Sequence, residues 1–392
     1  MTHDAQTAFH FDVPHDRRNT CSQKWMDLPT ADSIAMCLAD MDFQAPQAVT
    51  DAFAARVAHG IYGYTHYPDG LTQHITAWVQ RRYAWSVAEE WIAMNVGVVA
   101  SLCTIIRALT QEGDRVIIQT PVYAPFFTSI RNNQRVVVEN QLILEDGHYQ
   151  MDFDTLEAQA RDAKLLILCN PHNPVGRVWT RAELSRVGEI CLAHGVTIVS
   201  DDIHCDFALS RPYQALAALD DAFAQQSITC LAASKTFNIA GLDTSYEIIP
   251  NPELREKVAR EKAGRGISKP NMFGLLALEQ VYQHGDAWLE ALCAYLRTSH
   301  ALLHAHLDPL EQVRCTTPEG TYLAWLDCRA SGRTSRELSD YLLQTAHVRL
   351  TPGRIFGAPG EGFLRLNYGT DHTTLRTGLE RIAEAFSALA PA

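Results

Sequence analysis

Between about residues 95 and 235, short apolar runs alternate with stretches whose apolar residues recur at helical spacing. Runs of this length and composition are typical of strands, and their alternation with helices indicates a parallel or mostly parallel sheet. Helices on both faces of such a sheet give an α/β fold. The four runs are RVIIQT (115–120), KLLILCN (164–170), VTIVSD (196–201) and SITCLAAS (227–234).

One helix of this region has both a start and a stop signal. The stretch TRAELSRVGEICLAHG begins with Thr180, and Glu183 follows three residues later as the second half of a capping box. Gly195 supplies the stop. We therefore expect a helix between Thr180 and Gly195.

The pattern changes after about residue 290. GTYLAWLDCR (320–329) alternates like a half-exposed strand, and GFLRLNY (362–368) predicts a second strand. Helices are expected in 335–346 and 374–389, so this part reads as a smaller α+β domain. The most loop-like stretch between the two halves is KAGRGISKPNMFG (262–274).

Composition narrows the class of protein. A length of 392 residues exceeds one ordinary domain, and a formal charge of −12 argues against a nucleic-acid or acidic membrane partner. No apolar run approaches the ~18 residues of a membrane span, and the N-terminal sequence lacks the pattern of a secretion signal. Ten cysteines are scattered singly, so neither disulfides nor a metal site is expected. We expect a cytoplasmic protein with a small-molecule ligand.

Polar residues follow the apolar runs at the point where ligands bind in open α/β sheets, beyond the carboxyl ends of the strands. Each has an ordinary structural explanation on its own: Asn-Pro is common in turns, an acidic pair often caps a helix, and a lysine usually reaches water. Their combination favours a ligand site. The residues are Asn170 and Asn173 in NPHNPVG, Asp201, Asp202 and His204 in DDIH, and Lys235.

The order N-P-x-N-P-x-G, S-D-x-I-H and S-K-T-F-N-x-A-G-L resembles the fold-type-I enzymes of pyridoxal phosphate (PLP), the aminotransferase class I/II superfamily. ADMDF (39–43), YGYT (62–65), SKTFNIAGL (234–242) and FLRLNYG (363–369) resemble its MalY/PatB branch of cystathionine β-lyases. The resemblance covers nearly the whole chain. It implies a large PLP-binding domain over 46–288, and a small domain formed by 1–45 and 289–392.

The resemblance also implies roles for the residues at the strand ends. Lys235 matches the lysine that forms the Schiff base with PLP and then acts as acid and base, which requires a lowered amine pKa. Asp201 matches the carboxylate that pairs with the pyridine nitrogen, and Asp202 is expected behind it. With Tyr123 of TPVYAPF, whose ring would lie flat on the cofactor unless it is a core tyrosine, Lys235 and Asp201 are the expected catalytic residues.

Further cofactor contacts follow from the same resemblance. Asn173 and His204 match positions that hydrogen-bond the cofactor O3′, whereas Asn170 either joins them or only shapes the turn. NVGVVASLCTIIRAL (95–109) places a glycine turn ahead of a helix, so free N–H groups there would face an anion, the cofactor phosphate. The free N–H groups are those of Val99 and Ala100. Ser234 and Tyr64 would add hydroxyl donors to the phosphate, and Tyr64 would reach it from the partner subunit of a homodimer with shared sites.

Arg365 in FLRLNYG matches the arginine that binds the substrate α-carboxylate, because its planar fork suits two oxygens. The alternation along this strand puts Arg365 on the face opposite its leucine neighbours, which fits a pocket and a solvent-facing strand equally well. The resemblance favours the pocket. Backbone groups around Leu38 and Ala39 are expected to complete the carboxylate site.

Four positions depart from the pattern of the branch. Asp243 stands where the superfamily carries arginine or a neutral residue, and a carboxylate there would repel a phosphate dianion. Either Asp243 points away or the phosphate site differs. Cys37 stands in place of a tryptophan, which leaves room for a bulkier substrate, and Cys21 and Met26 depart in a neighbouring segment.

The resemblance implies a PLP-dependent carbon–sulfur β-lyase that cleaves S-substituted cysteine, either cystathionine-like or bulkier, to thiol, pyruvate and ammonia. A thiolate, from a thiol of pKa ~8.5, is a tolerable leaving group. Two alternatives stay open: an aminotransferase or a decarboxylation-dependent oxidative deaminase on a sulfur-linked amino acid. A non-catalytic regulatory protein of the same fold is a further interpretation, which the intact Lys235, Asp201, Asn173 and Arg365 oppose.

Overall fold

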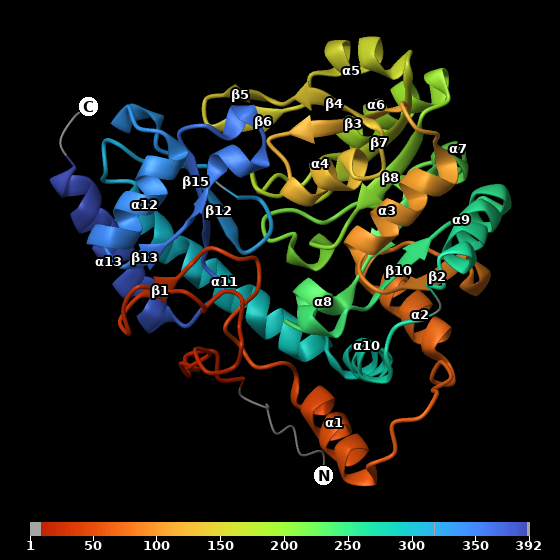
Figure 1. The fold of residues 1–392 in the computed structure, drawn as a ribbon, viewed down its shortest axis with the longest axis horizontal. Helices are drawn as coiled ribbons and strands as arrows, with labels where there is room; N and C mark the ends of the chain where they lie inside the picture. Colours follow the sequence, from red (N-terminus) through yellow and green to blue (C-terminus); the bar gives the residue numbers. More distant parts are fainter. Residues whose placement is uncertain (1–8, 268, 317, 390–392) are drawn as a thin grey trace.

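Residues 9–267, 269–316 and 318–389 are described by the computed structural model of the chain (Figure 1). Residues 1–8 lie outside the described residues. They belong to the expected small domain and to the N-terminal sequence that was considered above for a secretion signal. Among the helices that are described, none is both long enough and apolar enough to cross a membrane.

A seven-stranded sheet forms the centre of the larger part of the molecule. Strands β3, β4, β7, β8 and β9 pair in parallel, and β10 is antiparallel to both of its neighbours, β9 and β2. The predicted mostly parallel sheet is thereby confirmed. In spatial order the strands are β2 (Ile92–Asn95), β10 (Ser245–Ile248), β9 (Ser227–Leu231), β8 (Thr197–Asp201), β7 (Ala163–Cys169), β3 (Arg115–Thr120) and β4 (Val136–Gln141).

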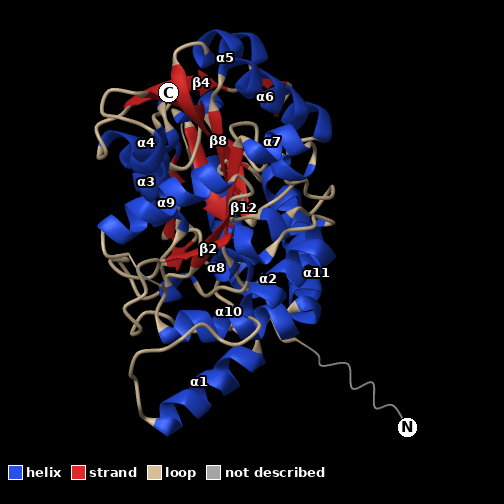
Figure 2. Cartoon of the chain, turned by 90° about the vertical axis from the view of Figure 1, so that its right-hand side faces the viewer, coloured by secondary structure: helices blue, strands red, loops and turns tan. Residues whose placement is uncertain are grey.

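Helices cover both faces of this sheet because successive strand residues point to opposite sides. Val116 and Ile118 pack with helices α3, α4 and α9, whereas Ile117 packs with α5 and α6 on the other face. Figure 2 shows the strands between these two helix layers. The helices are α3 (Val98–Leu109), α4 (Ala124–Arg131), α5 (Phe153–Ala160), α6 (Arg181–His194), α7 (Asp221–Gln225), α8 (Ala233–Thr236) and α9 (Pro252–Gly264).

The predicted signals of helix α6 are present in the structure. Thr180 accepts a hydrogen bond from the Glu183 backbone, the Glu183 side chain accepts one from the Thr180 backbone, and Gly195 adopts the left-handed conformation that ends the helix. The predicted loop between the halves is shorter than expected, because α9 extends to Gly264 and α10 begins at Met272.

A smaller four-stranded antiparallel sheet lies in the C-terminal part, with a parallel pair of short strands, β1 and β13, beside it. The helices and strands outside the large sheet and its layers are α1 (Gln47–His59), α2 (Leu71–Tyr83), α10 (Met272–His284), α11 (Asp286–Leu307), α12 (Ser335–Thr345), α13 (His372–Ala388), β1 (Ile34–Ala35), β5 (Ile143–Glu145), β6 (His148–Gln150), β11 (Arg314–Cys315), β12 (Leu323–Asp327), β13 (Val348–Arg349), β14 (Thr351–Pro352) and β15 (Phe363–Asn367).

Strand β12 is buried rather than half-exposed as its sequence suggested. Leu323 and Leu326 pack into the core shared with helices α11 and α13, while Trp325 stacks on Phe363 and donates from Nε1 to the hydroxyl of Tyr149. Both faces of the strand are therefore covered. The expected domain limits stay a prediction, and the limit at 288/289 falls inside helix α11.

Candidate active site

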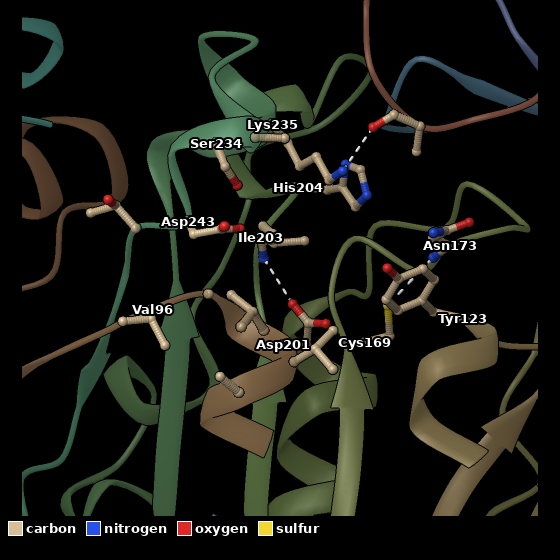
Figure 3. A pocket seen from close by; sticks show the side chains of 17 residues that line it. Val96, Tyr123, Cys169, Asn173, Asp201, Ile203, His204, Ser234, Lys235 and Asp243 are labelled. Carbon is tan, nitrogen blue, oxygen red and sulfur yellow. Dashed lines mark hydrogen bonds between the residues drawn. The ribbon is translucent and has the colours of Figure 1, made fainter. Parts of the chain in front are cut away.

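A cavity of about 230 Å³ lies at the carboxyl ends of strands β7, β8 and β9 (Figure 3). Its position agrees with the general rule for ligand sites in open α/β sheets. The expected site residues that line it are Ala39, Val99, Ala100, Tyr123, Asn173, Asp201, His204, Ser234 and Lys235. Leu38, Tyr64, Asn170 and Arg365 are not among the lining residues.

Lys235 sits on α8, directly after strand β9. Its Nζ donates a hydrogen bond of 2.7 Å to the backbone oxygen of Ala39 (Figure 3). Burial lowers the pKa of the amine, against the attraction of Asp40. A lysine with a lowered pKa is neutral more of the time and can act as a nucleophile and base.

Asp201 ends strand β8 and is buried in the cavity floor. Among the described residues its side chain accepts one hydrogen bond, of 3.2 Å from the Ile203 backbone N–H to Oδ1. Burial raises the pKa of this carboxyl to about 7, while the Ile203 N–H and the charge of Lys235 act in the opposite direction. A buried carboxyl with so few partners suits a cationic N–H donor.

Asp202 points away from the cavity. It accepts hydrogen bonds from the hydroxyls of Ser200, at 2.5 Å, and Tyr213. Burial raises the pKa of Asp202 to about 7 as well. Its place behind Asp201 agrees with the expectation that it does not touch the ligand.

His204 and Asn173 line the cavity, and each has a polar atom without a hydrogen-bond partner among the described residues. Nδ1 of His204 is buried without a hydrogen-bond partner among the described residues, and burial lowers the pKa of its ring to about 3. The ring is therefore neutral. The oxygen of the Asn173 side chain accepts from Arg365, at 3.1 Å, which leaves the amide nitrogen available as a donor.

Asn170 does not take part in the cavity, contrary to its expected place among the cofactor contacts. Its amide nitrogen donates to the Gln214 backbone at 2.9 Å, and its oxygen accepts from the Trp179 backbone at 3.4 Å. Both polar atoms are used in fixing the turn after β7, so the alternative of a turn-shaping residue fits the geometry.

Tyr123 lies directly before helix α4 and lines the cavity beside Asn173 (Figure 3). Burial raises the pKa of its hydroxyl, so the side chain is neutral at physiological pH. Its ring meets Phe126 edge to face, with centroids 6.0 Å apart. The ring thus has a fixed place at the cavity wall and offers an aromatic surface to a flat ligand.

The opposite end of the cavity is built from hydrogen-bond donors. The first intrahelical bond of α3 runs from Ser101 to Gly97, so the N–H groups of Val98, Val99 and Ala100 have no backbone acceptor among the described residues. Gly97 has a φ of 120°, which an L side chain rarely adopts. Together with the Ser234 hydroxyl these groups make a seat for an anion.

Arg365 is buried on strand β15 and does not face solvent. Its guanidinium donates to Asn173 at 3.1 Å and to the backbone oxygen of Cys37 at 2.9 Å, and it lies over the ring of Phe356. Nε has no partner among the described residues. Burial lowers the pKa of Arg365 to about 10.

The backbone N–H groups of Leu38 and Ala39 also lack a backbone acceptor among the described residues. Ala39 lines the cavity, and the nearby Cys37 is held by Arg365. An arginine beside two free N–H groups is a chemically suitable set of donors for a carboxylate. The expected carboxylate site stays a prediction.

The sequence did not single out the residues that hold this segment in place. Residues 37–43, here called the strap, are tied to the N-terminal part by a buried ion cluster. Lys24 donates to Asp42 at 2.7 Å and to the Asp40 backbone at 3.1 Å, and Arg17 bridges both carboxylates. Asn238 bonds the strap from the other side, through the Met41 and Phe43 backbone. Lys24 lies in the motif TCSQKWM, and Asp40 and Asp42 lie in ADMDF. The sequence did not indicate that these two motifs contact each other.

The departures from the branch pattern fall at different distances from the cavity. Asp243 lines it and does not point away. Cys37 is half-buried, and burial raises the pKa of its thiol. Cys21 and Met26 are exposed. Tyr64 is fully exposed in the segment between α1 and α2, away from the cavity of its own chain.

Comparisons with known proteins agree with this geometry. The family described as aminotransferase class I and II matches residues 31–382. The chain is 42% identical over 387 residues to cystathionine β-lyase PatB of Bacillus subtilis, covering 96% of this chain and 100% of PatB. It is 30% identical over 394 residues to protein MalY of Escherichia coli, covering 97% and 100%. Its fold is similar to that of cystalysin from Treponema denticola, whose crystal structure contains pyridoxal 5′-phosphate, with a TM-score of 0.94, 30% identity and coverage of 98% and 100%.

Proposed function

The chain belongs to the aminotransferase class I and II family, in the branch of PatB and MalY, and we propose that it acts as a PLP-dependent carbon–sulfur β-lyase. The substrate is an S-substituted cysteine, and the products are a thiol, pyruvate and ammonia. The observation that carries the proposal is the buried Lys235, which has a lowered pKa and shares one cavity with the poorly paired Asp201.

The residues present fit PLP as the cofactor. Asp201 suits the ring nitrogen, His204 and Asn173 offer unpaired groups for the ring oxygen, and the start of α3 with Ser234 suits the phosphate. Tyr123 offers its ring face. When bound, PLP supplies a cationic ring that accepts electron density from the substrate Cα.

The protein's own residues then perform binding and proton transfer. Arg365, with the N–H groups of Leu38 and Ala39, binds the substrate α-carboxylate and orients the Cα–H bond toward Lys235. Lys235 accepts the Cα proton at Nζ, and the electron pair of the Cβ–S bond leaves with sulfur as a thiolate. Lys235 can return a proton to the departing group, and water completes the release of pyruvate and ammonia.

We further propose that two copies of the chain share their sites. Tyr64 is too far from its own cavity to line it, although its hydroxyl would suit the phosphate of a neighbouring subunit. Its surroundings are unusually apolar for a free surface: Ile61, Tyr62 and Tyr67 are exposed in the same segment, and Val57 is exposed near the end of α1. A second copy that covers this segment would bury these side chains.

One experiment tests both the site and the reaction. The holoenzyme is incubated with a panel of S-substituted cysteines of increasing size, and thiol, pyruvate and ammonia are quantified. We expect the three products in equal amounts, with bulky substituents accepted because Cys37 replaces a large side chain. After borohydride reduction, the cofactor is expected on the peptide containing residues 231–243.

The test variant is Lys235→Ala. The matched control is Lys164→Ala, because Lys164 is exposed on β7. Only Lys235→Ala should abolish labelling and turnover. Label on Lys24, Lys164 or Lys269 would refute the site. Carbon dioxide, or amino transfer without thiol release, would refute the lyase reaction and favour the decarboxylating or transaminating enzyme on the same site.

A further inference from the structure

Asp243 is an acidic side chain at the donor-rich end of the cavity. It lies between η4 (Ala240–Leu242) and strand β10, and it lines the cavity together with Ser234 and Gly97. Figure 3 shows its carboxylate on the same side of the cavity as Ser234. None of the described residues donates a hydrogen bond to this carboxylate or pairs with it as an ion.

The groups around Asp243 are suited to binding an anion that enters the cavity from solution. The free N–H groups at the start of α3 and the Ser234 hydroxyl converge on this end of the cavity, and a helix N-terminus attracts negative charge. Lys235 is the one cationic side chain among the described residues that line the cavity, and its Nζ is bonded to Ala39. Among these lining residues, no other cation offsets Asp243 when a second anion arrives.

We propose that Asp243 is an affinity-setting residue that weakens the hold of this protein on the phosphate of PLP. The inference rests on the proposed function, which seats the phosphate at the start of α3. A carboxylate and a phosphate dianion that line the same small cavity repel each other, and this repulsion acts at short range even though the Asp243 side chain is exposed to solvent. The consequence is a cofactor that exchanges with the pool in solution.

The backbone conformation of Asp243 allows a substitution that changes the charge of the side chain and little else. Its φ is 46°, in the left-handed region, where Asn is tolerated about as well as Asp. Asp243→Asn thus removes the charge and keeps the shape and the turn. Asp162→Asn is the matched control, because Asp162 is exposed just before β7, at the amino end of the sheet, opposite the cavity.

The experiment measures equilibrium binding to cofactor-free protein, by absorbance titration, for PLP and for pyridoxal, which lacks the phosphate. We expect Asp243→Asn to bind PLP at least about tenfold more tightly than the wild type and to leave pyridoxal binding unchanged. PLP release after dilution should slow by a similar factor. Asp162→Asn should match the wild type for both ligands.

The outcomes separate the inference from the function on which it rests. If Asp243→Asn tightens both ligands equally, leaves PLP unchanged or weakens it, the carboxylate does not act on the phosphate and the inference is wrong. PLP would still label Lys235 in that case. If PLP fails to bind at Lys235 in every variant, the proposed function fails first, and the inference with it.

Discussion

The strap and the cavity floor meet at Lys235, but their buried polar groups differ in how many hydrogen bonds they accept. In the strap, the Asp42 carboxylate accepts hydrogen bonds from Lys24 at 2.7 Å, Arg17 at 2.8 Å and Trp25 at 2.9 Å. In the floor, Asp201 accepts one bond of 3.2 Å within the described residues, and Nδ1 of His204 accepts none.

This difference separates scaffold from ligand-binding groups. Buried polar atoms in proteins almost always have partners, so a buried atom without one points to a missing ligand or to a functional cost in stability. The strap is fixed in advance and presents its N–H groups at a defined place. On the proposed function, the polar groups of the floor gain their partners when the cofactor binds. Removing a strap group should therefore destabilise the cofactor-free protein, and removing a floor group should stabilise it.

The largest effect is expected from Lys24→Met, which removes a cation that holds the strap through Asp42. Although burial raises the pKa of Asp42, the charge of Lys24 and the hydrogen bonds around it lower that pKa overall. The substitution leaves a buried carboxylate short of its main counter-ion, which costs about 3–5 kcal/mol in the free energy of unfolding. Urea unfolding of the cofactor-free protein measures this cost.

Lys164→Met is the control for a lost lysine, since Lys164 is exposed, and it should change the free energy of unfolding by less than about 0.5 kcal/mol. A loss below about 1 kcal/mol in Lys24→Met would mean that Arg17 alone sustains Asp42. In that case the strap would be less rigidly fixed than its hydrogen bonds indicate.

Asp201→Asn in the floor is expected to act in the opposite direction. The pKa of Asp201 is raised from 3.8 to about 7, so between these values the unfolded chain has released a proton that the folded protein keeps. Wild-type stability therefore falls as pH rises through this window. The variant has no such loss, and cofactor-free Asp201→Asn should be more stable by roughly 4 kcal/mol at pH 8.

The gain should be small near pH 4 and vanish below the ordinary Asp pKa of 3.8, where both states of the wild type carry the proton. Urea unfolding at several pH values from 4 to 8 measures the trend, and turnover by the holoenzyme should fall although stability rises. A variant that is equally stable as the wild type at pH 8 would show that Asp201 is better paired in solution than its one hydrogen bond indicates.

The floor could be predicted from the sequence, whereas the strap could not. Strand ends follow from apolar runs, and the strand-end rule by itself brings Asp201, His204 and Lys235 to one edge of the sheet. Lys24 and Asp42 are 18 residues apart in a region without helix or strand periodicity, so no pattern links them. Their pairing depends on how the chain folds back on itself.

Two features of the strands and strand ends depend on parts of the chain that are distant in sequence. Strand β12 alternates like a half-exposed strand, and its burial depends on Phe356 and Phe363, which cover Trp325 from elsewhere in the chain. Asn170 occupies a strand end as the rule requires, and only the position of the Gln214 backbone turns its side chain away. Side-chain direction and coverage are tertiary properties, which a local pattern does not determine.

The smallest effect is expected from Thr351→Val, which tests whether the strap is held redundantly. The backbone oxygen of Cys37 accepts one bond from the Thr351 hydroxyl, at 2.7 Å, and another from Arg365, at 2.9 Å. Valine keeps the shape and removes the first donor, while the second still satisfies the oxygen. A lost hydrogen bond of this kind lowers the free energy of unfolding by about 0.5–1.5 kcal/mol.

The control is Thr377→Val on helix α13, which removes an exposed hydroxyl bond of 2.9 Å to the Thr373 backbone and should cost a few tenths of a kcal/mol at most. Substrate KM should change less than threefold in Thr351→Val, because Arg365 still fixes Cys37 and so keeps the Leu38 and Ala39 N–H groups in place. A loss above about 3 kcal/mol, or a large rise in KM with kcat unchanged, would mean that Arg365 cannot hold the strap alone. The fixed scaffold would then end at Asp40 rather than at Cys37.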